Sequence, residues 1–156
     1  EAEGQETLAP IDRMIGDINA RPYGTPEEEL RASWTEDMCW WGPTGIGATY
    51  TVPRYIEQHQ RPFRSRIGTR VFNGHLARLA EGAYGGFFGW ANLTLTSSGS
   101  FMGMPAGGPA DMRVVDLYRR AGDRLAENWI FIDMLHYYRM QGLDVLGRLA
   151  EVGRGG

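Results

Sequence analysis

The chain has 156 residues, of which 42% are hydrophobic, and its formal net charge is −3. These values predict one globular domain with a sizeable core, and they argue against a disordered chain and against a basic nucleic-acid-binding surface. The apolar run 129–132 is far shorter than the roughly 20 residues that a membrane-spanning helix needs. All 16 basic residues are Arg. A Schiff-base mechanism through a Lys amine is therefore excluded.

Cysteine and histidine are both scarce. Cys39 is the single cysteine, so no intrachain disulfide can form and a cysteine-based metal site is not expected. His59, His75 and His136 have no recognisable metal-ligand spacing, and we predict neither a metal nor a cofactor. The acidic opening 1–6 lacks the pattern of a signal peptide. We therefore expect a cytoplasmic protein, with an arginine bias of the kind that bacterial genomic base composition produces.

The first half of the chain has helical patterns. Residues 7–20 carry apolar side chains at spacings of three and four, which predicts an amphipathic helix. These side chains are Leu8, Ile11, Ile15 and Ile18. A second helix is predicted over 25–34, because a capping Thr25 is followed by Pro26 and three acidic residues. A short strand is expected over 38–41, and a third helix over 51–60 that Pro62 ends.

The second half has four strand-like stretches separated by turns, at 69–79, 83–96, 112–120 and 124–135. Helices followed by an antiparallel meander indicate an α+β fold. A curved antiparallel sheet packed with the N-terminal helices would form a cone around a central pocket, where ligands bind. We treat residues 1–156 as a single domain with a core of about 7–150.

The loop 97–110 is rich in Gly, Pro and Met. Its Phe101, Met102 and Met104 offer flexible apolar contacts. Two interpretations remain open for this loop. It lies over the pocket mouth and orders on ligand binding, or it is a surface loop or hairpin tip that packs on a partner subunit.

The segment from Met112 to Arg119, the turn 122–127 and the strand 128–133 resemble the C-terminal signature of the SnoaL-like polyketide cyclases. That family belongs to the nuclear-transport-factor-2-like superfamily, together with ketosteroid isomerase and an epoxide hydrolase. Residues 141–144 are similar to the ending of the family's last helix. The order of elements matches over nearly the whole chain, and the residue-level likeness runs from 112 to about 146. The resemblance implies a cone-shaped α+β domain, no cofactor, and a homodimer formed through the convex face of the sheet.

Asp133 is the first candidate catalytic residue. Strand alternation places it on one face with Trp129 and Phe131, and burial among such neighbours would raise the pKa of its carboxyl group. The resembled cyclases use one aspartate of the final strand as acid and base in an aldol ring closure, and Asp133 is the matching position. The alternative is that Asp133 caps the following helix or pairs with an Arg, of which Arg113 is the nearest candidate.

His75 is the second candidate, because a neutral imidazole can orient a substrate carbonyl or relay a proton. Many members of the family pair the aspartate with a histidine on a neighbouring strand, whereas the stretch 112–120 contains none. An exposed or hydrogen-bonded strand residue is the alternative for His75. Arg113, Asp116 and Arg119 invite comparison with the Asp-Arg-Asp arrangement of the epoxide hydrolase, although cross-strand ion pairs are the simpler interpretation.

Aromatic side chains are expected to form the pocket wall, together with Arg113. The predicted lining residues are Trp41, Tyr84, Trp90, Trp129 and Phe131. Such walls suit flat ligands, and the alternative is that these rings belong to the core.

Taken together, the residues favour a pocket for a small hydrophobic or aromatic carbonyl compound. The enzymatic hypothesis is cofactor-independent acid/base catalysis, namely aldol cyclisation or isomerisation. The alternatives are a non-catalytic ligand-binding or dimeric interaction module, and a hydrolase or dehydratase of the same fold.

Overall fold

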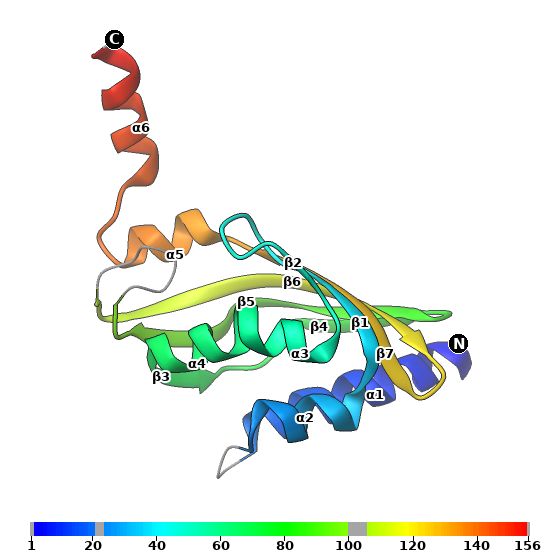
Figure 1. The fold of residues 1–156 in the computed structure, drawn as a ribbon. Coiled ribbons are helices and arrows are strands. Elements are labelled where there is room, and N and C mark those ends of the chain that lie inside the picture. The colour runs from blue at the N-terminus through cyan, green and yellow to red at the C-terminus, as the bar shows by residue number, and fades with distance from the viewer. Residues whose placement is uncertain (1, 21–23, 100–105, 156) are drawn as a thin grey trace.

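The computed structural model describes residues 2–20, 24–99 and 106–155. A long curved sheet has helices packed against its concave side (Figure 1). The loop residues Phe101, Met102 and Met104 lie outside the described part of the chain, so the hypothesis of a lid stays a prediction. None of the described helices is long and apolar enough to cross a membrane.

The two N-terminal helices form as their sequence patterns predict. Helix α1 (Ala2–Asn19) buries one apolar stripe, which includes Ile11, Met14 and Ile15. Helix α2 (Pro26–Ser33) begins with a capping box, in which the Thr25 hydroxyl accepts a bond from the Glu28 amide and the Glu28 carboxylate accepts one from the Thr25 amide.

The third helical region continues through Pro62, so the prediction that Pro62 ends it is wrong. This region consists of α3 (Val52–Tyr55), the π-helical turn η1 (Ile56–Gln60) and α4 (Arg61–Arg66). The wider turn of η1 leaves Pro62 in the first turn of α4, where a missing amide proton costs little. Single π-helical turns are frequent at functional sites, and this one brings His59 and Gln60 to the cavity described below.

The sheet has the strand order β2-β1-β7-β6-β5-β3, and β4 pairs with β5 beside β3. Its strands are β1 (Trp34–Trp41), β2 (Ala48–Tyr50), β3 (Ile67–Phe72), β4 (Ala77–Glu81), β5 (Tyr84–Ser97), β6 (Pro109–Ala121) and β7 (Arg124–Ile132). The α+β class is confirmed, but the sheet is mixed, because β1 runs parallel to β7 while the other pairs are antiparallel. The sequence patterns predict neither β2 nor the first half of β1.

The predicted strand 69–79 is broken into β3 and β4. The first pairs with the far end of β5 and the second with its start. Between them the chain leaves the sheet at residues 73–76, where Gly74 has a φ of 99° that favours glycine. The register of β5 against β6 also shifts between Gly89 and Leu93. The break carries His75 to the concave side.

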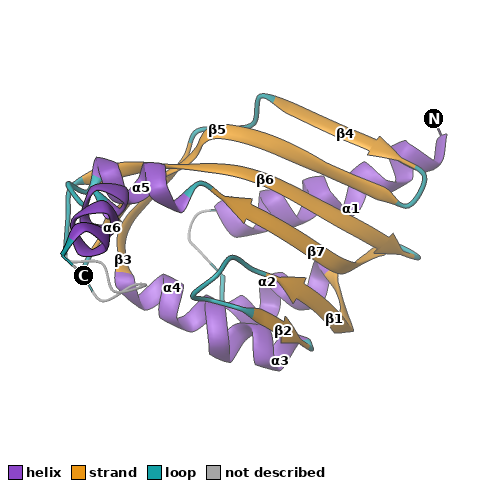
Figure 2. Ribbon diagram, turned by 90° about the horizontal axis from the view of Figure 1, so that it is seen from above, coloured by secondary structure: helices purple, strands orange, loops and turns teal. Residues whose placement is uncertain are grey.

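The two faces of the sheet differ in what covers them. Even-numbered side chains of β6, including Val114, Asp116 and Tyr118, are buried beneath the helices. On the opposite, outer face Trp90 and Phe131 are exposed. Helix α5 (Met134–Met140) packs on β6. The last helix, α6 (Val145–Arg154), extends away from the outer side of the sheet (Figure 1) and lies at one end of the strands (Figure 2).

Candidate functional site

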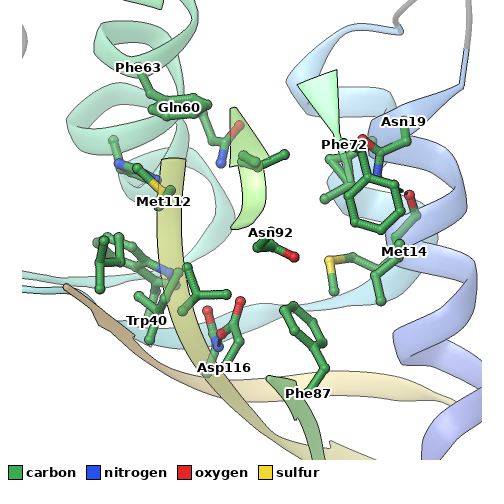
Figure 3. A pocket seen from close by; sticks show the side chains of 18 of the residues that line it. Met14, Asn19, Trp40, Gln60, Phe63, Phe72, Phe87, Asn92, Met112 and Asp116 are labelled. Atoms are coloured by element: carbon green, nitrogen blue, oxygen red, sulfur yellow. Dashed lines mark hydrogen bonds between the residues drawn. The ribbon is translucent and has the colours of Figure 1, made fainter. Parts of the chain in front are cut away.

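A cavity of about 140 Å³ lies between the concave face of the sheet and the helices. Its lining is mostly apolar and comes from α1, α2, the helical region 52–66 and five strands. Figure 3 shows Met14 and Asn19 of α1 on one side, Gln60 and Phe63 on another, and Asp116 beside Phe87 on the sheet. A cavity of this size is close to the roughly 150 Å³ that holds a benzene ring in an apolar core.

Asp116 is the buried carboxyl group of this cavity. It lies on β6 and is 6% exposed. The Asn128 amide of β7 donates hydrogen bonds to Asp116 Oδ1 and, at 3.0 Å, to the Leu117 carbonyl. Burial raises the pKa of Asp116 to about 7, and hydrogen bonds from Asn128 and Tyr118 oppose the rise. Near neutral pH the carboxyl group is therefore present in both protonation states.

Two phenols lie near this carboxyl group. Tyr118 follows Asp116 on the same face of β6 and hydrogen-bonds to it. Tyr55 of α3 accepts a hydrogen bond of 2.8 Å from Gln60 Nε2 and keeps its own proton to donate. Burial raises the pKa of both phenols, and the nearby Asp116 raises them further. Both side chains therefore remain neutral hydrogen-bond donors at physiological pH.

His59 reaches the same cavity from η1. Its ring stacks on Trp40 with a centroid distance of 4.4 Å and lies 5.6 Å from the ring of Phe63. Burial lowers the pKa of His59 to about 3. The imidazole is therefore neutral in the physiological range.

His75 lines the cavity from the break between β3 and β4. Its ring stacks on Phe87 at 3.7 Å and meets Phe72 edge-on at 5.3 Å. Burial lowers the pKa of His75 to about 4, and the neighbouring Arg78 lowers it further. The prediction that His75 belongs to a continuous strand is wrong, whereas its catalytic role stays a prediction.

Several polar atoms of the cavity lining are buried without a hydrogen-bond partner among the described residues. They are Glu29 Oε1, Trp34 Nε1 and His59 Nδ1. Unpaired buried polar atoms are costly, and in native proteins water or a ligand usually satisfies them. The set contains both donors and acceptors, which suits a ligand with carbonyl and hydroxyl groups.

Asp133 does not line the cavity, so its predicted placement is wrong. It follows β7 with a side chain that is 44% exposed. Its carboxylate accepts a 2.9 Å hydrogen bond from the His136 amide at the start of α5 and lies 3.7 Å from Arg113 Nη1. The alternative interpretation, a helix cap paired with an arginine, is confirmed. The predicted alternation of β7 is confirmed, but the face assigned to the cavity is wrong, because Asn128 and Ile130 line the cavity instead of Trp129 and Phe131.

The predicted pocket wall lies on the opposite face for the same reason. None of the residues predicted to form it belongs to the cavity lining, namely Trp41, Tyr84, Trp90, Arg113, Trp129 and Phe131. Arg113 lies over the Trp90 ring at 5.8 Å, and the ring of Tyr84 is 6.5 Å from that of Trp129. The aromatic lining of the cavity comes from other residues, which are Trp34, Trp40, Tyr55, Phe63, Phe72, Phe87 and Tyr118.

The interpretation of Asp116 as a partner in cross-strand ion pairs is wrong. Arg119 pairs with Glu127 at 2.8 Å and Arg113 with Asp133, whereas Asp116 is bonded to an amide and a phenol. The sequence does contain one signal for its role. Asp116 is in phase with Val114 and Tyr118, so a carboxyl group stands among apolar residues in the middle of a long strand. Within the described residues, no group of three or more His, Cys, Asp or Glu could hold a metal ion.

Comparison with known proteins identifies the fold. No protein-family model matches the sequence, and no curated protein matches it. Solved structures do match. The crystal structure of a candidate SnoaL-like polyketide cyclase from Jannaschia sp. CCS1 is 17% identical, with a TM-score of 0.69 over 93% of this chain and 96% of that one. The crystal structure of an NTF2-like protein from Burkholderia xenovorans LB400 is 15% identical, with a TM-score of 0.66 over 88% of this chain and 97% of that one. The chain has the NTF2-like fold.

Two further solved structures that match this chain are described as enzymes of different kinds. The candidate polyketide cyclase IdmH from Streptomyces antibioticus is 16% identical, with a TM-score of 0.67 over 88% of this chain and 99% of that one. An LEH-like epoxide hydrolase from M. tuberculosis is 11% identical, with a TM-score of 0.61 over 96% of this chain and 98% of that one. The NTF2-like fold is therefore established, and the function must be argued from the residues of the cavity.

Proposed function

We propose that this chain catalyses a cofactor-independent proton transfer on a small hydrophobic carbonyl compound, with Asp116 as the acid and base. The observation that carries the proposal is a carboxyl group buried in an apolar cavity, with a pKa of about 7. A general acid or base works best when its pKa lies near the operating pH. The likeness to candidate polyketide cyclases supports a reaction of this class.

The cavity residues can divide the reaction between them. The ionised form of Asp116 takes a proton from the carbon next to the carbonyl group, and the electron pair of the broken C–H bond moves into the enolate. The neutral phenol of Tyr55 is a donor for the developing oxyanion, whereas the phenol proton of Tyr118 is donated to Asp116. The neutral form of Asp116 then returns the proton to carbon, which gives an isomer, or the enolate attacks a second carbonyl of the same ligand in an aldol closure. The Asn128 amide orients the carboxyl group throughout.

The size of the cavity restricts the ligand. About 140 Å³ accommodates a ligand of about one ring. Most of its lining is aliphatic or aromatic, so binding is supplied mainly by apolar burial. We therefore expect cyclic ketones and enones of one ring to bind, and charged metabolites to bind poorly.

Hydrogen–deuterium exchange tests the proposed reaction. The wild-type chain in D2O should accelerate exchange at the α-carbon of cyclohexanone or cyclohex-2-enone, followed by proton NMR. Asp116→Asn should lower the enzymatic rate by about 10²–10⁴-fold, the usual contribution of a general base. Asp133→Asn is the matched control and should leave the rate unchanged, because Asp133 lies outside the cavity. No acceleration by the wild-type chain over a panel of such ketones, or equal loss in both variants, would contradict the proposal.

The outer face of the sheet supports the expected homodimer. Tyr84, Trp90 and Phe131 are 58%, 62% and 60% exposed there, and large exposed apolar patches on soluble proteins usually mark interfaces. Sedimentation should give twice the 17.4 kDa of one chain at micromolar concentration. Phe131→Glu should shift the equilibrium to monomer, whereas Arg54→Glu, a larger charge change on the exposed side of α3, should not. A wild-type monomer at this concentration would refute the dimer.

A further inference from the structure

A row of polar side chains runs from the surface to the cavity at its His75 side. Asp12 of α1 accepts a 2.6 Å hydrogen bond from Arg78 Nη1 of β4. Arg78 Nε in turn donates a 3.1 Å hydrogen bond to His75 Nδ1. Asp12 and Arg78 lie outside the cavity lining, whereas His75 belongs to it. The proton-transfer scheme above makes no use of this row.

The direction of these bonds fixes the protonation of the imidazole. A guanidinium group has five N–H donors and no acceptor, so His75 Nδ1 must supply the lone pair. A neutral imidazole carries one proton, which therefore resides on Nε2. The ring cannot turn freely to exchange its two nitrogens, because it is stacked on Phe87 and packed perpendicular to the ring of Phe72.

We propose that Arg78, anchored by Asp12, is a positioning residue that holds His75 as the neutral Nε2–H tautomer and so gives the cavity a fixed N–H donor, which a ligand oxygen would share with Asn92. The identity of that oxygen, a ketone or enolate oxygen, rests on the proposed function. The tautomer itself follows from this chain's own contacts. In the opposite tautomer Nε2 would present a lone pair to the ligand oxygen and repel it.

The surroundings of His75 favour a neutral ring. The charged groups that face it are Arg78 from β4 and Asp12 from α1, and the side chain of Asn92 on β5, which also lines the cavity, hydrogen-bonds to the ring. Burial has the largest effect and lowers the pKa of His75 to about 4, while Arg78 adds to this and the other two oppose it. The donor is therefore unchanged between pH 5 and pH 8. This separates its role from that of Asp116, which titrates in that range.

Nitrogen-15 NMR of the full chain tests the tautomer directly. Long-range proton–nitrogen spectra at pH 7 should show His75 with a protonated Nε2 and an unprotonated Nδ1, with the signals assigned through His75→Gln. In Arg78→Met the apolar stem remains but the donor is lost. The two nitrogen shifts should then move toward each other, and the pKa of His75 should rise toward its ordinary value. Arg54→Met, which removes an exposed arginine on α3, is the control and should change neither reading.

The exchange assay gives a second reading. Loss of one donor to an oxyanion costs about 10²–10³-fold in rate, and a ring that spends part of its time in the wrong tautomer should lose about tenfold. If Arg78→Met does not fold, Asp12→Ala keeps the arginine, removes its anchor and should shift the tautomer in the same direction. An Nδ1–H tautomer in the wild-type chain, or an unchanged tautomer and pKa in a folded Arg78→Met variant, would overturn the proposal. Because the spectra need no substrate, this failure is distinguishable from failure of the proposed reaction.

Discussion

Asp116→Asn should be more stable than the wild-type chain at neutral pH, with a free energy of unfolding that is higher by up to about 4 kcal/mol. The carboxyl group has a pKa of about 7 in the folded chain, against 3.8 when unperturbed. Between these values the unfolded chain loses its proton while the folded chain keeps it. The contribution of Asp116 to stability therefore falls as the pH rises from about 4 to about 7 and stays low above that. The side-chain amide of the variant would carry no charge, and its oxygen could still accept the Asn128 hydrogen bond.

Urea unfolding of both chains at pH 4, 5.5 and 7.5 measures this difference. Burial lowers the pKa values of His59 and His75, so both histidines add stability as the pH rises toward 6.5. Both chains share this effect, and subtracting the two curves isolates Asp116. Asp133→Asn, whose new side chain is also a good helix cap, should stay within about 1 kcal/mol of wild type at every pH. A difference for Asp116→Asn that does not grow with pH would contradict a buried carboxyl group with a raised pKa.

A gain in stability on removing Asp116 would also bear on its role. Functional groups are often retained at a cost to stability, because the burial that shifts the pKa of an ionisable side chain toward neutrality also destabilises the folded chain. A carboxyl group kept for structure alone should instead lower the stability when it is replaced. The pH series therefore measures the effect of Asp116 on stability, and the exchange assay measures its effect on the reaction rate.

The fold is largely predictable because local patterns determine it. The capping box of α2, the apolar stripe of α1 and the turn between β6 and β7 all depend on residues near one another in sequence. The parallel pairing of β1 with β7 joins segments about ninety residues apart and leaves no local signal. The break between β3 and β4 has only a weak signal in the sequence, which is Gly74 beside Asn73.

The face of the sheet that holds the site cannot be predicted from alternation alone. On β6 the even-numbered Val114 alternates with the odd-numbered Val115, and on β7 Ile130 alternates with Phe131, so both faces are apolar. Period-2 alternation says which residues share a face and not which face the helices cover. Because the larger aromatic residues lie on the odd-numbered face, a prediction from sequence assigns the pocket to that face. The helices cover the even-numbered face, where Asp116 is buried.

The close pairing of β5 and β6 that places Asp116 depends on a residue without a side chain. Gly86 lies opposite Leu117 in the register. A Cβ atom added to it would lie 2.1 Å from the Asp116 carbonyl oxygen and 2.9 Å from Leu117 Cδ2. The first of these is a backbone atom, so it cannot move aside unless the two strands separate. Contacts under about 3 Å at a Cβ atom essentially never occur in real structures.

Gly86→Ala should therefore lower the free energy of unfolding by about 3 kcal/mol, the upper end of the usual cost of overpacking. Gly68→Ala is the matched control, because Gly68 also lies in a strand and its added Cβ would be 3.4 Å from the Thr96 carbonyl oxygen, an ordinary contact. That variant should be as stable as wild type or slightly more so, since alanine loses less backbone entropy on folding. Urea unfolding at pH 7.5 compares the three chains. Equal stability of the two alanine variants would show that β5 and β6 are not this close, and the placement of Asp116 against the cavity would then lose its structural basis.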